Sequence, residues 1–304
     1  MKAENKNKRP ICLALGFFDG VHLGHQALIQ ETVVQAKARG LSSIIVTFDN
    51  HPDSVLYGEN IPLLTTPAEK KYLAKKAGVD LLMTLPFTHD VATLSPHDFL
   101  LHMYGITGLR GLVIGSDFAL GAGRRGNYPA LKKIGEEMGI EITRLPAVQQ
   151  NGQTISSTLV RRALIDGNLD KANSLLGHPY LVIGQVEKGL QRGKTIGFPT
   201  ANLSIHPLKM LPPDGVYAVK VRIAENQYLG ILNIGRRPTF KDSPRTFEVH
   251  LLDFTGNLYG CTLQTDIIKF IRSEQAFPDS LALARQISSD IQVARQILYE
   301  DNLL

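Results

Sequence analysis

The sequence predicts an α/β fold, with a parallel sheet and helices in the first half followed by an antiparallel β-barrel and a final helix. In the first half, short apolar runs alternate with helical patterns, which is typical of a parallel sheet. Gly40, Gly78 and Gly139 fall where helices are expected to end. In the second half, closely spaced runs of Val, Ile, Tyr and Thr are separated by Gly and Pro, as in a barrel. We therefore predict two domains, residues 1–179 and residues 180–304.

The first half consists of apolar strand-like runs, each followed by a helical pattern. The runs predict strands at Ile11–Leu15, Ser43–Phe48, Asp80–Leu85 and Gly111–Ile114. Helices are expected at Gln26–Ala38, Pro67–Ala77, Pro96–Met103 and Tyr128–Met138. This alternation predicts a parallel sheet that is covered on both faces and binds ligands at the carboxyl ends of its strands.

The second half begins after two short predicted helices, Leu159–Asp166 and Leu169–Leu176. Strands are expected at Tyr180–Glu187, Gly215–Ile223, Tyr228–Ile234, Thr246–Leu252 and Thr262–Ile271. The last segment, Ser280 to Leu298, places apolar residues at helical spacing, namely Leu281, Ala284, Ile287, Ile291, Ala294 and Leu298. This spacing predicts a final helix with one apolar face.

Composition favours a cytoplasmic protein that binds anionic small molecules. Of the 304 residues, 43% are hydrophobic and 20% are charged, and the net charge of +5 is scattered along the chain. Met1 to Pro10 is polar and basic, unlike a signal peptide, and no apolar run is long enough for a membrane span. Cys12 and Cys261 stand alone, so we expect buried thiols rather than a disulfide or zinc site. We expect no nucleic-acid or membrane partner, and the oligomeric state is not readable from the sequence.

The most informative motif is Gly16 to His25, in which His22 and His25 are spaced by two residues. The pair falls between a predicted strand and a predicted helix, where free amide groups and the helix dipole attract phosphate. Two imidazoles there could donate hydrogen bonds to phosphoryl oxygens in a transition state. A metal pair and two ordinary turn histidines are the alternatives. The motif resembles the HxGH signature of the nucleotidyltransferase superfamily.

Further segments are expected at the same edge of the sheet. His51 follows the second strand, where it either contacts a ligand or only stiffens a turn before proline. Gly115 to Phe118 follows the fourth strand, and glycines downstream bring its backbone near a ligand. Ile155 to Thr158 places hydroxyls ahead of a helix, with Arg161 one turn later. These groups form either a second anion site or a simple helix cap.

In chain order the first half contains GxFDGxHxGH, TFxxHP, LSPxxF, GxDFxxGxxxxG and ISSTxxR. This series resembles the FMN adenylyltransferase module of bacterial bifunctional FAD synthetases over roughly residues 11 to 178, and it implies a Rossmann-like nucleotidyltransferase domain. Phe17, Leu159 and Leu120 depart from the pattern, standing where many members have Asn, Arg and an aromatic residue. The resemblance implies ATP contacts for Gly16, Phe17, His22, His25, Ser156, Ser157, Thr158 and Arg161, and FMN contacts for His51, Asp117 and Phe118.

The second half has its own polar motifs. The stretch from Gly184 to Lys194 is glycine-rich and basic. Thr200 and Asn202 lie two residues apart on an expected extended segment, so both side chains face one side and could coordinate magnesium beside ATP phosphates. If Phe247, Val249 and Leu251 face the core, Glu248, His250 and Leu252 face away from it. Glu248 could then accept a proton from an attacking hydroxyl, or it could be an ordinary exposed strand residue.

The second half, over about residues 180 to 300, resembles riboflavin kinase. The motifs are GxVxxGxxxGKxxGFPTANL, LPxxGVYAV, NIGxRPTF, ExHLLDF and LYG. The resemblance implies a six-stranded barrel that binds MgATP and riboflavin. It implies ATP contacts for Gly189, Lys194, Gly197, Thr200 and Asn202, magnesium ligation by Thr200 and Asn202, base catalysis by Glu248, and flavin contacts for Arg272 and Glu274.

Together the two resemblances imply a bifunctional enzyme of flavin cofactor synthesis. The second domain would phosphorylate riboflavin to FMN with ATP and magnesium. The first domain would adenylylate FMN to FAD and release pyrophosphate. The alternative is a riboflavin kinase whose first half is a weak or divergent adenylyltransferase.

Overall fold

The computed structural model describes residues 9–58, 60–121, 123, 125–189, 193, 196–236 and 245–300. The strands are β1 (Ile11–Leu15), β2 (Ser42–Phe48), β3 (Leu81–Leu85), β4 (Leu109–Ile114), β5 (Glu141–Arg144), β6 (Gln149–Gln150), β7 (Gln153–Thr154), β8 (Tyr180–Glu187), β9 (Ala201–Ile205), β10 (Gly215–Ile223), β11 (Asn226–Arg236), β12 (Arg245–Leu251) and β13 (Thr262–Arg272). The helices are the 3-10 turn η1 (Asp19–Val21), α1 (Leu23–Ala38), α2 (Pro52–Tyr57), α3 (Pro67–Lys76), α4 (His89–Thr93), α5 (Pro96–Thr107), α6 (Tyr128–Met138), α7 (Ser157–Ile165), α8 (Leu169–Leu176) and α10 (Ser280–Glu300).

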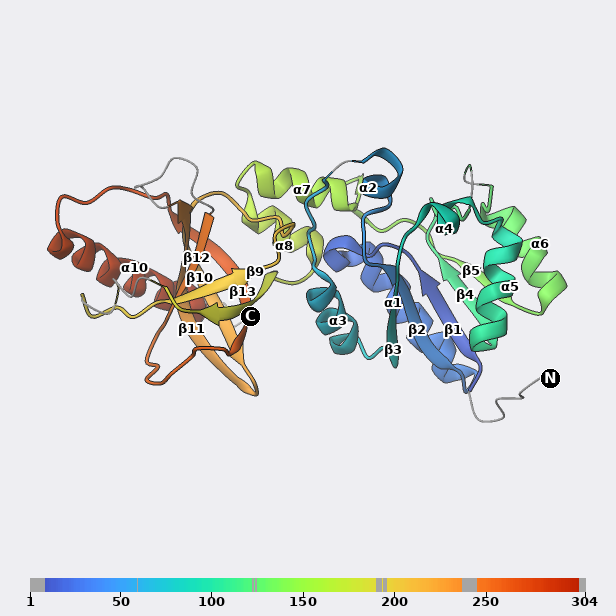
Figure 1. Ribbon diagram of the computed structural model, residues 1–304, viewed down its shortest axis with the longest axis horizontal. Helices are drawn as coiled ribbons and strands as arrows, with labels where there is room; N and C mark the ends of the chain where they lie inside the picture. The colour runs from blue at the N-terminus through green and yellow to red at the C-terminus, as the bar shows by residue number, and fades with distance from the viewer. Residues whose placement is uncertain are drawn as a thin grey trace. The chain divides into compact units, whose positions relative to one another are not determined.

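The first half forms the predicted parallel sheet, which in the described residues has five strands in the order β3-β2-β1-β4-β5 (Figure 1). All pairings in this sheet are parallel. The strand order reverses between β1 and β4, and open α/β sheets bind ligands at the carboxyl ends of the strands beside such a reversal. The histidine motif directly follows β1 and Gly115 directly follows β4. Both predicted segments therefore lie at the expected binding edge.

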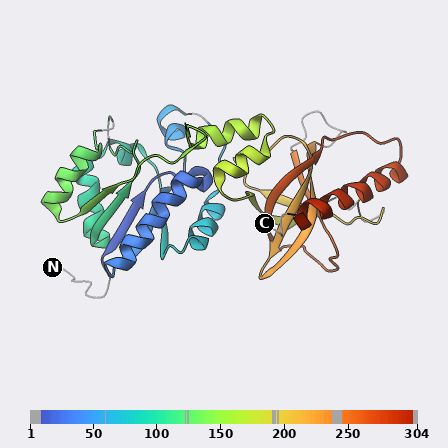
Figure 2. The same cartoon turned by 180° about the vertical axis from the view of Figure 1, so that it is seen from behind.

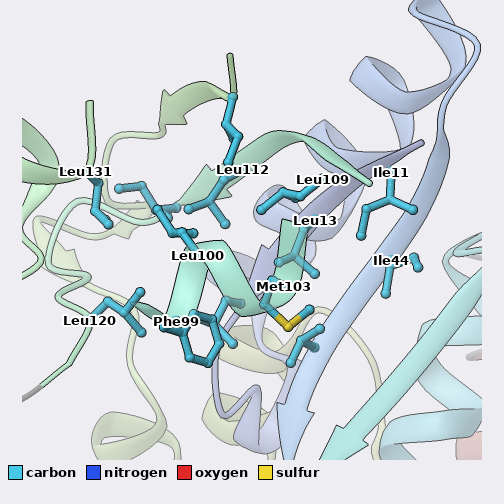
Figure 3. Packing of buried hydrophobic residues seen from close by; sticks show 14 of the residues in the cluster. Ile11, Leu13, Ile44, Phe99, Leu100, Met103, Leu109, Leu112, Leu120 and Leu131 are labelled. Carbon is cyan, nitrogen blue, oxygen red and sulfur yellow. The ribbon is translucent and has the colours of Figure 1, made fainter. Parts of the chain in front are cut away.

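Both faces of the sheet are covered by helices. On one face, Leu13 of β1 and Leu112 of β4 pack against Phe99 and Met103 of α5, and Figure 3 shows Met103 beside Leu13. On the other face α1 covers β1, β2 and β4, as seen from behind in Figure 2. Since β1 is buried along its whole length, close packing fixes its carboxyl end and thereby the position of the histidine turn.

The second half forms a closed antiparallel barrel, which in the described residues has the strand order β10-β11-β12-β9-β8-β13. This confirms the predicted six-stranded barrel. The helix α10 packs on the outside of β10, β11 and β13, where Ala294 and Leu298 meet Val216 and Ala218. Leu281, at the start of α10, is 59% exposed, so the apolar face is shorter than its spacing predicts.

By contacts the chain divides into Met1–Ser157 and Thr158–Leu304, and the functional boundary near residue 179 stays a prediction. One cause of the division after Ser157 is α8, which packs against β13. The side-chain amide of Asn173 on α8 donates to the carbonyls of Ile267 and Ile268, and its oxygen accepts from the N–H of Tyr180. These bonds attach α8 to the barrel.

Several short elements are absent from the sequence prediction. The strand β5 has only half-buried and exposed residues, and α2 and α4 contain no fully buried residue. Such elements lack the apolar periodicity on which the prediction depends. The helix α1 begins at Leu23 rather than Gln26, which brings His25 into its first turn. No helix in the described part of the chain is both long enough and apolar enough to cross a membrane.

Candidate active sites

The turn between β1 and α1 holds the first candidate site. Phe18 and Val21 adopt left-handed backbone conformations, with φ of 52° and 44°, and Gly20 has φ 82°. The turn places the N-terminus of α1 close after the carboxyl end of β1. His22 is the N-cap of α1, and His25 lies in the first turn. Because the first amides of a helix lack backbone partners, this terminus can bind phosphate.

The two imidazole rings of the motif stack on each other. Their centroids are 3.7 Å apart and the planes differ by 16°. A Cβ on Gly24 would lie 3.1 Å from Cε1 of His22, so the glycine leaves room for that ring. Phe18 packs edge-on against His25, with centroids 5.2 Å apart. The rings are therefore fixed by packing before any ligand binds.

Both imidazoles are neutral at neutral pH. Burial lowers the pKa of His22 to about 4, although the Asp19 carboxylate partly opposes this. Burial also lowers the pKa of His25 well below its ordinary value, with smaller contributions from His22 and Lys70. Near pH 7 neither imidazole is therefore protonated, and the pair carries no positive charge.

The hydrogen bonds of the pair define which nitrogen carries the proton. The backbone N–H of His25 donates to Nδ1 of His22 at 3.3 Å. Since Nδ1 of the neutral ring accepts, its proton lies on Nε2, which is a donor. Nδ1 of His25 is buried and has no hydrogen-bond partner among the described residues. Across all residues that the structure describes, no group of three or more His, Cys, Asp or Glu side chains is placed to hold a metal ion.

Asp19 ties the turn to the start of α3. It is 2% exposed, and its carboxylate accepts from the N–H groups of Leu64 and Thr65 at 3.1 and 2.9 Å. The hydroxyl of Thr65 accepts from the N–H of Gly20 at 2.9 Å. The hydroxyl of Ser157 donates to the carbonyl of Asp19 at 2.9 Å. Two distant segments therefore hold the turn in one conformation.

The predicted hydroxyl cluster lies where the chain enters α7. Ser157 is the first residue of that helix and contacts the turn, as described above, and Ser156 is half-buried. Thr158 is exposed and Arg161 is half-buried on α7, and both belong to the second contact unit. The structure thus brings Ser157 to the histidine turn, while the roles of Thr158 and Arg161 stay predictions.

His51 follows β2 and caps the short helix α2. Its Nδ1 accepts from the N–H of Asp53 at 3.2 Å, so the local turn role is present. Its ring also packs edge-on against Phe17, with centroids 4.7 Å apart. The N–H of Gly16 donates to the carbonyl of Val46 at 3.1 Å, which extends the sheet pairing into the motif. His51, Phe17 and Gly16 therefore share the carboxyl edge of β1 and β2.

A pocket of about 290 Å³ opens after β4. Asp117 and Phe118 line one part of it, and Tyr128 and Arg144 also line it. The guanidinium of Arg144 donates to the carbonyl of Ser116 at 2.9 Å and lies 5.6 Å from the ring centroid of Tyr128. The sequence-predicted pair Asp117 and Phe118 therefore belongs to a hollow at the end of the strand next to β1.

The second candidate site is a row of polar side chains across three barrel strands. Asn202 of β9 pairs with Glu248 of β12, which pairs with Asn233 of β11. The hydroxyl of Thr200 donates to Oε2 of Glu248 at 3.4 Å. The register thus brings an amide, a hydroxyl and a carboxylate together from segments far apart in the sequence.

The alternation predicted for β12 is confirmed. Phe247, Val249 and Leu251 are buried, whereas Glu248 is half-buried. The interpretation of Glu248 as an ordinary exposed residue does not fit this burial and its contact with Thr200. Leu252 was expected to face away from the core but is 5% exposed, because β12 ends at Leu251.

Two glycines predicted to contact ATP differ in their surroundings. A Cβ on Gly189 would collide with the side-chain amide of Asn202, so this residue lies directly against the polar row. Gly197 has φ 88° and open space around it, which suits a turn that only glycine adopts without strain. Lys194 lies outside the described residues.

The predicted flavin residues lie at the end of β13, where Arg272 is its last residue, and just beyond it. Glu274 accepts from the side-chain amide of Asn233 at 3.4 Å and therefore extends the polar row. The guanidinium of Arg272 instead binds the buried carboxylate of Asp290 on α10, through contacts of 2.8 to 3.1 Å. The structure thus attaches Arg272 to α10 and Glu274 to the row.

Sequence reasoning missed Asn233, Lys70 and Asp290 as part of these surroundings. Asn233 lies between buried Leu232 and Ile234, so strand alternation places it on the face of Glu248. On α3, Lys70 precedes the buried Leu73 and Ala74 by three and four residues, so helical spacing places it on the buried face of the helix. Periodicity could have shown only which way the first two residues face. Their contacts with Glu248 and Phe17, like the pairing of Asp290 with Arg272, require the fold.

Comparison with known proteins gives a consistent picture for both halves. The FAD synthetase family model matches residues 4–159, and the riboflavin kinase family model matches residues 176–298. The bifunctional riboflavin kinase/FMN adenylyltransferase of Escherichia coli K12 is 40% identical, covering 93% of this chain and 91% of that protein. The chain belongs to the bifunctional riboflavin kinase/FMN adenylyltransferase family.

Further members of this family and a solved structure agree. The family member of Bacillus subtilis is 37% identical, covering 96% of this chain and 93% of that protein. A crystal structure described as a macrolide-efflux protein from Streptococcus pneumoniae is 31% identical, with a TM-score of 0.83 over 94% of each chain. These relatives span both halves, so the order of the two modules is that of the family.

Proposed function

We propose that the two activities of the family are divided between the two halves of this chain. The chain is a riboflavin kinase and an FMN adenylyltransferase, and ATP is a substrate of both reactions. We assign kinase activity to residues 180–304 and adenylyltransferase activity to residues 1–179. The observation that supports this division most strongly is that each half carries its own polar site: the histidine turn after β1 and the row across β9, β12 and β11.

In adenylyl transfer, a phosphate oxygen of FMN attacks the α-phosphorus of ATP. The new P–O bond forms as the bond to the bridging oxygen breaks, and pyrophosphate leaves with the electron pair. Negative charge increases on the phosphoryl oxygens, and the Nε2–H of His22 is the donor assigned to them, beside the N-terminus of α1. His25 is assigned the neighbouring contact. Because both rings are already stacked, little reorganisation is needed.

We assign the other predicted residues of this half by the same reasoning. Gly16 and Phe17 border the ATP site, and Ser156, Ser157, Thr158 and Arg161 hold the triphosphate. The hydroxyl of Ser157 donates to the carbonyl of Asp19, so Ser157 lies beside the histidine turn, and this O–H would have to leave the carbonyl to donate to a phosphate. Asp117 and Phe118 line the flavin region, with His51 close to Phe17.

In the kinase reaction, Glu248 accepts the proton of the ribityl 5′ hydroxyl of riboflavin. The hydroxyl oxygen then attacks the γ-phosphorus of ATP, the bond to the bridging oxygen breaks, and ADP leaves. Glu248 is half-buried beside Thr200, which suits a base that must be oriented. We place the nucleotide beside Gly189, Lys194 and Gly197, and the flavin toward Glu274. Arg272 would shape the flavin segment through its bond to Asp290.

The donor set of the polar row fits magnesium. Thr200 and Asn202 supply a hydroxyl and an amide oxygen, and the carboxylate of Glu248 lies 3.4 Å from that hydroxyl. Mg²⁺ prefers such oxygen ligands and usually keeps several waters. We propose that Thr200 and Asn202 hold Mg²⁺, which when bound neutralises charge on the ATP phosphates.

We further propose a cytoplasmic enzyme whose partners are riboflavin, FMN and ATP, without nucleic acid or membrane. The two cysteines are free thiols, Cys12 buried and Cys261 half-buried, which suits a reducing compartment.

Flavin chromatography tests the proposed function. The intact protein is incubated with riboflavin, ATP and magnesium, and separately with FMN, ATP and magnesium. We expect FMN and then FAD from the first mixture, and FAD with pyrophosphate from the second. FMN without FAD in both mixtures would contradict the assignment of the first half.

A further inference from the structure

The charge around the histidine pair is opposite to what a triphosphate requires. Both imidazoles are neutral, for the reasons given above. The carboxylates that act on His22 are Asp19 and Asp117, and Asp19 is almost fully buried. At the histidine pair, ATP would therefore meet neutral donors with negative neighbours, and Arg161, which is assigned to the triphosphate, belongs to the second contact unit. A site that must hold phosphate needs a cation nearby.

The first unit provides a buried cation at this place, Lys70 of α3. Lys70 is 3% exposed, and its Nζ lies 3.6 Å from the centroid of the Phe17 ring. Nζ is also 3.5 Å from the hydroxyl of Thr47 and from the carbonyl of Phe48, at the carboxyl end of β2. An ammonium in this position lies at the same sheet edge as the histidine turn.

The contacts of Lys70 are weak for a buried charge. Its two hydrogen bonds are long, and Lys70 forms no salt bridge with the residues that the structure describes. A buried ammonium without a direct carboxylate partner costs stability. Such a cost indicates a function for the charge rather than a role in packing.

We propose that Lys70 is a positioning residue for adenylyl transfer, whose ammonium, held behind the Phe17 ring, supplies the positive field that attracts the ATP phosphates to the histidine pair. The inference rests on the proposed adenylyltransferase function. In this proposal Phe17 has a role: its ring holds the ammonium by a cation–π contact at the carboxyl end of β1. The α3 helix is held there by the bonds between Thr65 and Asp19.

The proposal predicts a pH dependence. Burial lowers the pKa of Lys70 to about 8, with Asp19 and Asp49 opposing the shift. The titratable groups that face it are therefore Asp19 after β1, Asp49 after β2 and His25 on α1. As pH rises through about 8 the free enzyme loses this charge, and kcat/KM for ATP in FAD formation falls.

The test compares Lys70→Met, Lys70→Arg and the neighbouring exposed Lys71→Met in the full chain. FAD formation from FMN and ATP is measured between pH 6.5 and 9.5, together with FMN formation from riboflavin and a melting curve. For Lys70→Met we expect kcat/KM for ATP to fall on the order of 10²-fold at pH 7, mainly because KM rises. In this variant kcat/KM should no longer fall as pH rises through about 8, so the alkaline limb of the pH profile should be absent. Lys70→Arg should restore most of the activity and move the limb to higher pH. Lys71→Met should match the unmodified chain, and FMN formation should be unchanged in all three variants.

Each other outcome has a distinct meaning. FAD formation within twofold of the unmodified chain in Lys70→Met overturns the inference, as does loss of both activities together with a lower melting temperature that Lys70→Arg does not repair. If Lys70→Met does not fold, an alkaline limb that is the same in Lys70→Arg and the unmodified chain overturns it. Absence of FAD formation in the unmodified chain contradicts the proposed function itself.

Discussion

The two candidate sites are built in opposite ways. The histidine site is made of one short turn, in which ring stacking, a helix cap and left-handed residues fix the groups within ten residues of sequence, Gly16 to His25. The barrel site is made of single residues on different strands, joined by register between Asn202, Glu248 and Asn233. The first depends on local backbone geometry and the second on global strand pairing.

The sites also differ in how they treat charge. The histidine pair is buried and neutral, so its contribution is preorganised hydrogen bonding. The barrel site is half-buried and presents a carboxylate beside a hydroxyl. The difference is the one that the proposed assignment requires, because a hydroxyl nucleophile needs a base, whereas the phosphate of FMN is already a nucleophile.

Replacing the base is expected to have the largest effect. Glu248→Gln keeps the shape of the row but cannot accept a proton, so FMN formation should fall by ~10²–10⁴-fold. FAD formation from supplied FMN should be unchanged, because we assign it to the other half. Both rates are measured by flavin chromatography. FMN formation near that of the unmodified chain would show that the two sites do not differ in their need for a base.

A second change tests the dependence of the barrel site on close packing. In Gly189→Ala the new Cβ would collide with the side chain of Asn202, so the row must shift. A displacement of about 1 Å can cost about 10²-fold in rate, and FMN formation should fall by roughly this factor. Gly105→Ala is the matched control, since a Cβ there meets nothing within 4 Å. Equal kinase activity in both variants would separate Gly189 from the site.

The same contrast explains how much could be predicted from the sequence. The parallel sheet, the barrel and the final helix were predicted because their apolar residues form repeated strand-like runs or recur at helical spacing. The strand β5 and the helices α2 and α4 were missed because they bury few residues. The contact units divide after Ser157, since α8 binds the barrel through Asn173, and no local pattern shows such a bond.

For the sites, the histidine turn was predictable since its residues are consecutive. Their neutrality and the presence of Lys70 behind Phe17 were not, because both depend on burial by distant segments. In the barrel, Thr200, Asn202 and Glu248 were named from motifs, whereas Asn233 needed the register. The attachment of Arg272 to Asp290 required the position of α10.

A smaller effect concerns the neutrality of the histidine site. Because the pKa of His22 is lowered to about 4 in the folded chain, the unfolded chain binds more protons below its ordinary pKa of 6.5. The stabilisation from neutral His22 is therefore complete above pH 6.5 and decreases as pH falls toward 4. Between pH 7 and pH 5 the loss is about 2 kcal/mol.

The check is urea unfolding of the unmodified chain and His22→Asn, in which Asn retains the ability to cap a helix. The difference in the free energy of unfolding between the two proteins should change by this amount between the two pH values. A difference that does not depend on pH would contradict a neutral, buried His22.

The most direct measurement of the division between the two halves is the flavin profile of the double variant His22→Ala/His25→Ala, incubated with riboflavin, ATP and magnesium. If the pair acts only in adenylyl transfer, riboflavin should be consumed at the rate of the unmodified chain, and the FMN formed should accumulate. FAD formation should be lower by ~10²–10³-fold, since donors to developing charge are lost and their effects need not add. A melting curve recorded on the same sample verifies that the variant is folded. Undiminished FAD formation in the folded variant, or equal loss of FMN and FAD, would contradict two separate sites in one chain.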